Sequence, residues 1–272
     1  MNIDTEVSSE IKSLTKLQIN KINVVEAIIT KVTNLNTLEY ERLYHIYTKY
    51  YEGHSKDQFL KDLFEKNHII LLRDKKNKSL QGFSTLLKVK IPTANGFIYG
   101  VYSGDTILEK EYWGHPALGK AFLRYLWIEK LKNPFSPLYW FLISKGYKTY
   151  LIMANNFKTH FPRYETETPD YARDLMNNFY GVKFQDAFVK EKLWIRPNKY
   201  SCRLKDQIAD ISDKDRNHPR IAYFERANPN WKMGCELACI AKMTLLMPMK
   251  YTIKKILMTF FKPTLKRSSN LN

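Results

Sequence analysis

One stretch, a strand followed by a tight turn and a helix, constrains the fold of this chain more than any other. The run FIYGVYSGDTIL (97–108) is rich in β-branched and aromatic residues, which favours a central strand. In the segment EYWGHPALGK (111–120), Gly114 and Pro116 interrupt the strand, and Pro116 suits the first position of a helix. The helix, residues 117–132, is apolar on nearly every side and is expected to lie between two layers. A glycine-bearing turn at a helix N-terminus presents free backbone amides to an anion.

The flanking segments predict an alternation of strands and helices with one apolar insert at 134–146. Strands are expected at 21–32, 68–74, 79–91, 147–156 and 182–189, with an edge element, a turn at 228–230 and a last strand within 218–243. A helix is expected within 35–51, with Asn36 as its N-cap, and a second one from Ser55 to residue 67. A third is expected at 168–181, with Thr168 as its cap, Pro169 at its first position and Gly181 at its end. A further helix is possible at 202–211. The short polar connections between the strands at 68–108 predict an antiparallel meander.

Composition bounds the class of protein and its partners. With 272 residues and 44% apolar content, the chain can bury a sizeable core. The three cysteines, Cys202, Cys235 and Cys239, are too few for a disulfide framework, no secretory signal opens the chain, and no apolar run of about 18 residues occurs. We therefore expect a cytoplasmic protein. The net charge of +17 predicts anionic partners: a phosphorylated cofactor, an acidic carrier protein, anionic lipid or nucleic acid.

This order of elements resembles that of the GNAT acyltransferase superfamily over roughly residues 21–243. The segment EYWGHPALGKAFL (111–123) is similar to the superfamily's acyl-CoA signature, with Gly119 at its last small position and Ala117 before it. Gly114 stands where the family has Arg or Gln, so the side chain expected on the phosphates is missing. A second segment, YARDLMNNFYGVKF (171–184), resembles the closing unit of the fold.

The resemblance implies an α/β (α+β) fold with a mixed, mostly antiparallel central sheet flanked by helices. We expect a loose lead-in (1–20), the GNAT-like domain (21–243) and a basic amphipathic C-terminal helical extension (244–272). The fourth and fifth strands of such a fold splay, here 97–108 and 147–156, and the gap binds a pantetheine arm. The implied reaction moves an acyl group from acyl-CoA or an acylated carrier protein to an amine.

Candidate site residues follow from placing the resemblance on this sequence. Asp105 and Glu111 are candidate bases, and Tyr180 is the candidate acid for the leaving thiolate, although solvated carboxylates and a core tyrosine remain the plain alternatives. The candidate cofactor-binding residues are Tyr102, Ser103, Gly114, His115, Ala117, Leu118, Gly119, Lys120 and Asn155. For His115, the sequence favours a role as a helix cap or an exposed residue over contact with a phosphate or an acyl thioester. The scattered histidines predict no metal site.

Rival interpretations exist for three segments. GHPALGKA (114–121) matches a nucleotide phosphate-binding loop, except that Ala121 replaces the metal-binding Ser or Thr. The basic and aromatic run 144–164 suits stacked bases of nucleic acid as well as a strand with solvated lysines. Residues 241–267 carry seven Lys or Arg and no acid, which suits an interfacial helix on the inner face of a membrane or a helix docked on 134–146. The alternative function is therefore a non-catalytic protein that binds membrane or nucleic acid.

Overall fold

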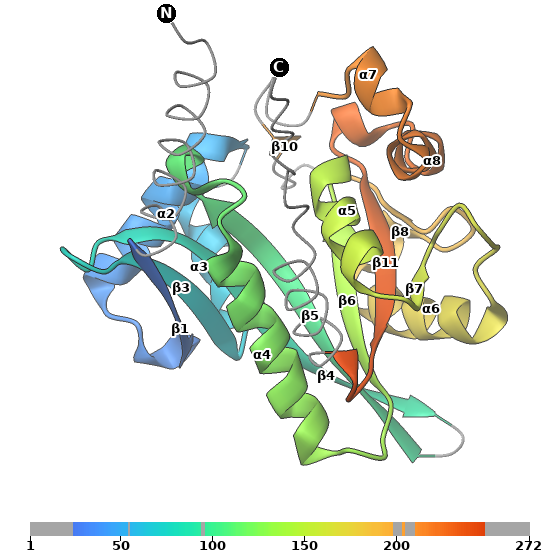
Figure 1. Cartoon of the computed structure of the whole chain (residues 1–272), viewed down its shortest axis with the longest axis horizontal. Helices are drawn as coiled ribbons and strands as arrows, with labels where there is room; N and C mark the ends of the chain where they lie inside the picture. Colours follow the sequence, from blue (N-terminus) through green and yellow to red (C-terminus); the bar gives the residue numbers. More distant parts are fainter. Residues whose placement is uncertain (1–23, 54, 94–95, 198–202, 205–209, 248–272) are drawn as a thin grey trace, which may run out of the picture.

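The computed structural model describes residues 24–53, 55–93, 96–197, 203–204 and 210–247 (Figure 1). At its centre is a nine-stranded sheet in the order β1-β3-β4-β5-β6-β11-β9-β8, with β7 paired to β11, and β2 pairs separately with β10. The strands are β1 (Val25–Lys31), β2 (Tyr51–Glu52), β3 (His68–Asp74), β4 (Leu80–Thr93), β5 (Gly96–Leu108), β6 (Leu138–Ser144), β7 (His160–Phe161), β8 (Phe188–Val189), β9 (Trp194–Ile195), β10 (Arg203–Leu204) and β11 (Glu236–Met243). The α-helices are α2 (Thr37–Tyr50), α3 (Lys56–Phe64), α4 (Pro116–Lys132), α5 (Tyr147–Asn156), α6 (Asp170–Phe184), α7 (Asp213–Arg216) and α8 (Pro219–Ala227).

All neighbouring strands of the large sheet are antiparallel except β5 and β6, which are parallel. This confirms the predicted fold class, a mixed and mostly antiparallel sheet flanked by helices. The meander is confirmed as well, because β3, β4 and β5 pair in sequence order, and β1 adds to the free edge of β3. The helices α2 and α3 begin after the predicted caps Asn36 and Ser55, whose side chains accept hydrogen bonds from amides of the first turn.

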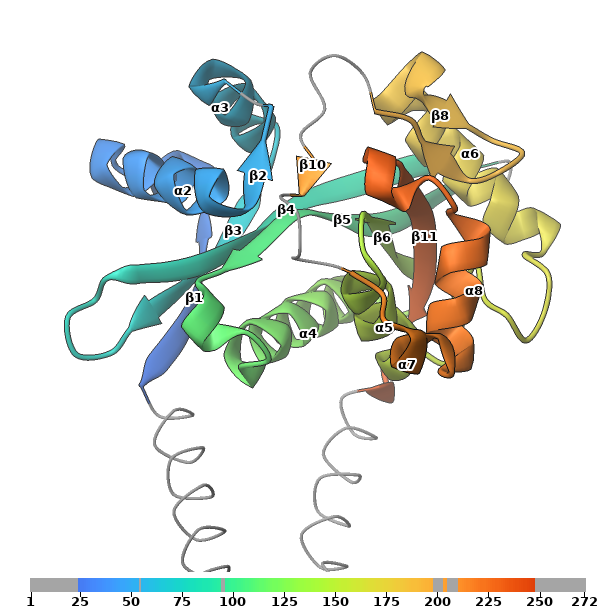
Figure 2. The ribbon, with the colours of Figure 1, turned by 90° about the horizontal axis from the view of Figure 1, so that it is seen from above.

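Helices cover both faces of the sheet (Figure 2). On one face α4, α5 and α8 pack against Trp140 and Leu142 of β6. On the other face α6 packs against Tyr139 and Phe141, while α2 and α3 cover the meander. Alternate residues of β6 thus enter opposite cores, because side chains alternate across a strand. The continuous apolar sequence of β6 follows from its burial on both faces.

The helix α4 begins at the predicted Pro116, but the expectation that it lies between two layers is wrong. It rests on the sheet through residues such as Phe122 and Leu126, which are 7% and 0% exposed. Its outer side carries Trp127, Ile128 and Leu131, which are 39%, 38% and 48% exposed. The sheet covers one side of the helix, so an apolar sequence here does not indicate complete enclosure.

Two neighbouring segments have structures other than those predicted. Residues 134–146, the expected insert, contain β6, and residues 147–156, the expected strand, form α5. The buried residues of α5 include Tyr147, Tyr150 and Met153, whose spacing of three is that of one helix face. The tyrosines therefore mark a helical period and do not alternate across a strand.

Boundaries in the C-terminal half also need correction. The helix α6 has Pro169 as its N-cap, with no side-chain cap, and it continues past Gly181 to Phe184. The predicted strand 182–189 is consequently helical at its start, and only Phe188–Val189 forms β8. The expected edge element within 218–243 is the helix α8, whereas the last strand is confirmed as β11. In the segment 202–211, Arg203–Leu204 form a strand and 205–209 lie outside the described residues, as do the lead-in 1–20 and the tail beyond Met247.

Candidate active site

The parallel strands β5 and β6 diverge at one end. Their pairing runs from Tyr99 opposite Leu138 to Ser103 opposite Leu142, while β5 continues to Leu108. Beyond Ser103, β5 remains paired with β4 but no longer with β6. The sheet is therefore open at this point. The predicted splay exists, but its second strand is β6 and not 147–156, because that segment is helical.

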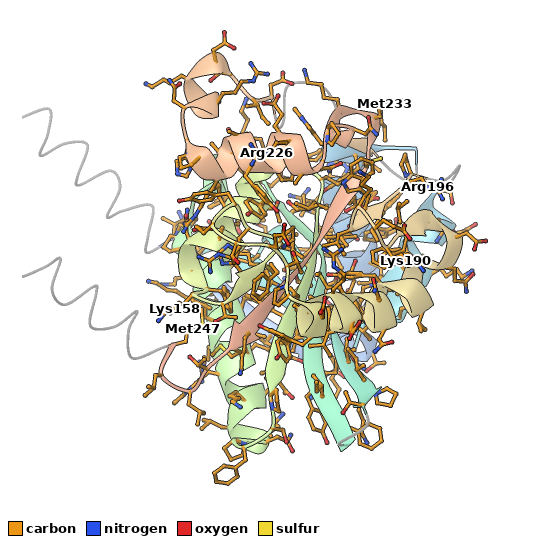
Figure 3. The ribbon with its side chains drawn as sticks, turned by 90° about the vertical axis from the view of Figure 1, so that its right-hand side faces the viewer. Lys158, Lys190, Arg196, Arg226, Met233 and Met247 are labelled. Carbon is orange, nitrogen blue, oxygen red and sulfur yellow. The ribbon has the colours of Figure 1, made fainter. Side chains whose placement is uncertain are left out.

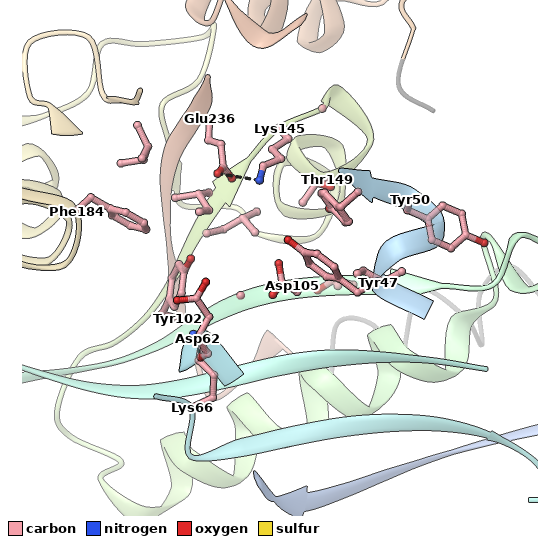
Figure 4. A pocket seen from close by; sticks show the side chains of 18 of the residues that line it. Tyr47, Tyr50, Asp62, Lys66, Tyr102, Asp105, Lys145, Thr149, Phe184 and Glu236 are labelled. Carbon is pink, nitrogen blue, oxygen red and sulfur yellow. Dashed lines mark hydrogen bonds and ion pairs between the residues drawn. The ribbon is translucent and has the colours of Figure 1, made fainter. Parts of the chain in front are cut away.

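A pocket of about 590 Å³ lies at this opening (Figure 4). Its volume is in the range of small-molecule and cofactor sites. One side is formed by α2, α3 and β5, and the other by β6, the start of α5, the end of α6 and the start of β11. Elements far apart in the sequence thus converge on the gap between the two strands. The charged side chains that line the pocket are Asp62, Glu65, Lys66, Asp105, Lys145, Lys148, Lys183, Arg196 and Glu236.

Glu236, the first residue of β11, is a half-buried carboxylate in this pocket. Its side chain is 14% exposed and lies 3.2 Å from the Nζ atom of Lys145 (Figure 4). Burial raises the pKa of Glu236 above its ordinary value, and the charge of Asp105 adds to the rise, whereas Lys145 lowers it. Because the net pKa shift is upward, Glu236 holds its proton more tightly than a solvated carboxylate does, as suits a group that exchanges protons.

Lys66 and Asp105 face the pocket from the opposite side (Figure 4). The Lys66 side chain is 6% exposed, and its Nζ atom donates a hydrogen bond of 2.7 Å to the carbonyl of Asp62. Burial lowers the pKa of Lys66, and the neighbouring charge of Lys183 lowers it further. The pocket therefore holds an acid and an amine whose pKa values are both shifted in the direction that favours the neutral form.

Aromatic side chains complete the pocket on the α2 side. Tyr47 stacks on Tyr51 with ring centroids 4.9 Å apart, and Tyr50 contacts Trp113 at 5.9 Å. All four residues line the pocket, together with Tyr102 of β5. These rings supply apolar area for the bodies of ligands, between the charged groups of the two sides.

The three candidate catalytic residues fall in different places. Asp105 lines the pocket. Glu111 is exposed on the short 3-10 helix η2 (Lys110–Tyr112) and is not among the residues that line it. Tyr180 is completely buried, and its hydroxyl lies 2.7 Å from the carbonyl of Cys239 and 3.0 Å from that of Leu142. Of the three candidates, Asp105 therefore lies in the pocket. The hydroxyl of Tyr180 is hydrogen-bonded to the backbone of β6 and β11 and does not line the pocket.

Of the candidate cofactor-binding residues on β5 and α5, only Tyr102 lines the pocket. The hydroxyl of Ser103 points to the other face, where it accepts a hydrogen bond of 2.8 Å from the indole of Trp140. Asn155 is exposed near the end of α5, and its side-chain oxygen accepts a hydrogen bond from Arg220.

The turn at the start of α4 is next to the pocket through Trp113, which lines it. His115 caps the helix, because its Nδ1 atom accepts a hydrogen bond of 3.2 Å from the amide of Ala117. Gly114, Gly119 and Lys120 are exposed, while Leu118 is buried in the core under α4. Since Pro116 has no amide hydrogen and the Ala117 amide is already bonded, the amide of Leu118 is the one that the first turn of α4 offers to an anion.

Sequence reasoning missed Glu236, Lys145 and Lys66. A signal for Glu236 exists: it is the single charged residue in the apolar run GCELACIA (234–241), and charged residues are seldom buried without a partner. Lys145 falls in the basic and aromatic run 144–164, where it was expected to be solvated. No local pattern distinguishes Lys66 from the other lysines of its segment, because its burial depends on β5 and α6.

No protein-family model matches the chain, and no curated protein matches it significantly. Among solved structures, the chain is similar to a conserved protein of unknown function from Enterococcus faecalis, with a TM-score of 0.36, 13% identity, and 49% of this chain and 33% of that chain covered. It is also similar to the Escherichia coli GNAT family N-acetyltransferase YhbS in complex with CoA, with a TM-score of 0.32, 10% identity, and coverage of 44% and 64%. The third is Arabidopsis thaliana NAA60 in complex with a bisubstrate analogue, with a TM-score of 0.36, 15% identity, and coverage of 49% and 84%.

The aligned part is about half of this chain, and it spans one third of the Enterococcus protein and less than two thirds of the E. coli enzyme. These similarities are too low to support an activity. The arrangement of the strands is independent of them: three antiparallel strands, a helix that starts in a turn, and a parallel partner strand that diverges at a pocket. This topology agrees with the GNAT-like fold that the resemblance of the sequence predicts.

Proposed function

We propose that the protein is an acyltransferase that moves an acyl group from a pantetheine thioester to an amine. The observation that carries the proposal is the opening between β5 and β6, with a pocket that contains Asp105 and Glu236. An open pair of parallel strands exposes backbone groups to which an extended pantetheine arm can bind as a further strand would. The two carboxylates lie at the place where the thioester would then be.

The donor would enter along β5 and present its phosphates to the start of α4. The first turn of that helix offers the amide of Leu118 and the positive end of the helix dipole. Lys148, whose Nζ atom lies 5.3 Å from the centre of the Trp113 ring, adds positive charge beside this turn. CoA supplies such phosphates. An acylated carrier protein is the second donor of this proposal, because an acidic carrier suits a chain with a net charge of +17.

The chemistry requires an amine without its extra proton. Glu236, as a carboxylate, accepts that proton from the acceptor ammonium, and the neutral amine attacks the thioester carbonyl. A carbon–nitrogen bond forms, the carbon–sulfur bond breaks, and the thiolate leaves and takes up a proton as the thiol. Burial is the main cause of the raised pKa of Glu236, and the charge of Asp105 adds a smaller rise. Asp105 is also the second carboxylate available to the acceptor.

A thermal-shift titration tests the proposal with CoA, acetyl-CoA, a long-chain acyl-CoA and an acylated carrier protein. A ligand present at about 100 times its dissociation constant adds roughly 2.7 kcal/mol, which for a chain of this size is a shift of about 5–10 °C. We expect such a shift with at least one donor, followed by acyl transfer to an amine in a screen with that donor. If no donor shifts the transition, the proposal is contradicted and the non-catalytic binding protein becomes the better account.

A further inference from the structure

Lys66 is a buried amine that the proposed reaction does not use. It follows α3 directly, and its ammonium has one short hydrogen bond, to the carbonyl of Asp62, with the carboxylate of Glu65 4.0 Å away. Lysines are almost never buried so completely unless they are paired. The burial of Lys66 is therefore unlike that of a solvated surface lysine and indicates a specific role for its amine.

The side chain of Lys66 ends at the opening between β5 and β6. A Cβ atom added to Gly104 would lie 3.0 Å from the Cε atom of Lys66 and 2.5 Å from the hydroxyl oxygen of Thr85. Gly104 is the first residue of β5 after the last pair with β6. The absence of a side chain at Gly104 thus allows the amine to approach the strand where the proposed function places the thioester.

The charged groups around Lys66 come from three elements. Asp62 and Glu65 belong to the α3 segment, Asp105 to β5, and Lys183 to α6. The carboxylates raise the pKa of the amine, but burial and Lys183 lower it by more, so the net pKa shift is downward. A desolvated lysine beside another cation is the arrangement that makes an amine nucleophilic near neutral pH.

We infer that Lys66 is a site of self-acylation by the thioester donor bound between β5 and β6. The inference rests on the proposed function, because that function supplies the donor. In the step, the neutral Lys66 amine attacks the thioester carbonyl. A carbon–nitrogen bond forms, the carbon–sulfur bond breaks, and the amine hydrogen is balanced by the proton that converts the leaving thiolate to the thiol. The product is a stable amide, so the step is a modification and not an intermediate.

This modification would regulate the enzyme. The acyl group occupies space beside Gly104, and the charge of Lys66 is lost from a pocket in which Asp105 and Glu65 lie close by. Acceptor amines then meet a filled and more negative pocket. Transfer by the modified protein is expected to be slower than transfer by the unmodified protein.

Mass spectrometry of the full chain after incubation with acetyl-CoA tests the inference. We expect an acetyl group on Lys66 at an occupancy about tenfold or more above that on Lys61, an exposed lysine of α3, because a bound donor acts at high effective concentration. An excess of CoA should suppress the modification of Lys66 and leave that of Lys61 unchanged. Transfer activity should decline during pre-incubation with acetyl-CoA, and the Lys66→Arg variant should show no such decline.

The outcomes separate this inference from the proposed function. If CoA shifts the thermal transition but Lys66 is acetylated no more than Lys61, self-acylation is wrong and the acyltransferase proposal stands. If Lys66 is acetylated equally fast with excess CoA present, the modification does not involve the pocket and the inference is again wrong. If no donor binds and neither lysine is modified, both proposals fail together.

Discussion

At the scale of single residues, Glu236 is the side chain whose environment bears most directly on the proposed chemistry. A carboxylate in water loses its proton well below neutral pH and is a weak base. Burial in the pocket raises the pKa of Glu236 from its ordinary value of 4.5, and the ion pair with Lys145 limits the rise. The balance between these two effects sets the pH range in which Glu236 can accept a proton from an amine.

Replacement of Glu236 by glutamine should reduce the rate of transfer by about 10²–10⁴-fold, the usual contribution of a general base. The pH profile should lose its ascending limb, which in the native protein reports ionisation of Glu236 above pH 4.5. The thermal shift with CoA should persist. Glu191→Gln, at a carboxylate that is 66% exposed, is the matched control and should leave the profile unchanged. A profile that keeps its limb in Glu236→Gln would assign the base to another residue.

The same variant has a predicted effect on stability. Because the folded pKa of Glu236 is raised, the native state binds the proton more tightly than the unfolded state does. The stability contributed by this proton is fully present below the ordinary pKa and is lost as the pH rises through the raised value. Urea unfolding at several pH values should show this loss in the native chain and a flatter dependence in Glu236→Gln.

Tyr180 illustrates how one hydroxyl can be structural. It bridges the carbonyls of Leu142 on β6 and Cys239 on β11, which lie opposite each other in the sheet. Tyr180→Phe leaves these buried acceptors without that partner, so unfolding should become easier by about 1–3 kcal/mol. Transfer per folded molecule should stay within about twofold if this is the whole role. A large loss of activity at unchanged stability would instead restore Tyr180 as the acid for the thiolate.

At the scale of elements, the sequence predicts local order better than long-range pairing. The meander and the starts of α2 and α3 depend on turns and caps a few residues long, and these were predicted correctly. The exchange of strand and helix at 134–156 has another cause: β6 is buried on both faces, so its sequence shows no alternation. As a result, the opening in the sheet was expected beside the wrong segment.

The residues of the site differ in the same way: some could be predicted from local sequence, and others depend on long-range pairing. Asp105 and Tyr102 were found because they lie on the strand that the sequence identifies most clearly. Glu236 and Lys145 come from segments that meet this strand only through the pairing of β5 with β6 and of β6 with β11. Their approach to one another is a property of the sheet order, which no local pattern encodes.

The helix α4 provides a test of the donor position. Gly119 and Gly181 are both helical glycines at which an added Cβ meets no atom within 4 Å. Leucine at either position should be tolerated and should raise helix stability by up to about 1 kcal/mol, since glycine is a poor helix former. Only Gly119→Leu should abolish the CoA shift, because it fills the first turn of α4. An unchanged CoA shift in Gly119→Leu would place the donor phosphates elsewhere.

At the scale of the whole molecule, the remaining proposal concerns the basic C-terminal segment and its contact with an anionic membrane. The described part ends at Met247, which packs on the α4, α5 and α8 side of the sheet (Figure 3). The basic segment 244–272 begins just before this residue, and a contact between it and an anionic membrane is still a proposal. Among the described residues, no helix has the length and hydropathy that crossing a bilayer would require.

Deletion of 248–272 should separate the tail from the pocket. The full chain should bind vesicles that contain anionic lipid in a salt-dependent manner. The shortened chain should lose this binding, because the deleted segment contains six Lys or Arg residues and no acidic residue. The thermal shift with CoA should be the same in both proteins. Equal binding of both to the vesicles would show that the attraction comes from the folded part of the chain.

The short pairing of β5 with β6 has a consequence for how the molecule is made. It joins two sets of strands, β1-β3-β4-β5 and β6-β11-β9-β8, each continuous in its own antiparallel pairing. The first set has mostly local contacts and can form while the rest of the chain is still being synthesised. Glu236 is synthesised long after Asp105 and meets it only when the second set docks. The proposed pair of carboxylates therefore does not exist in a nascent chain that ends before β11.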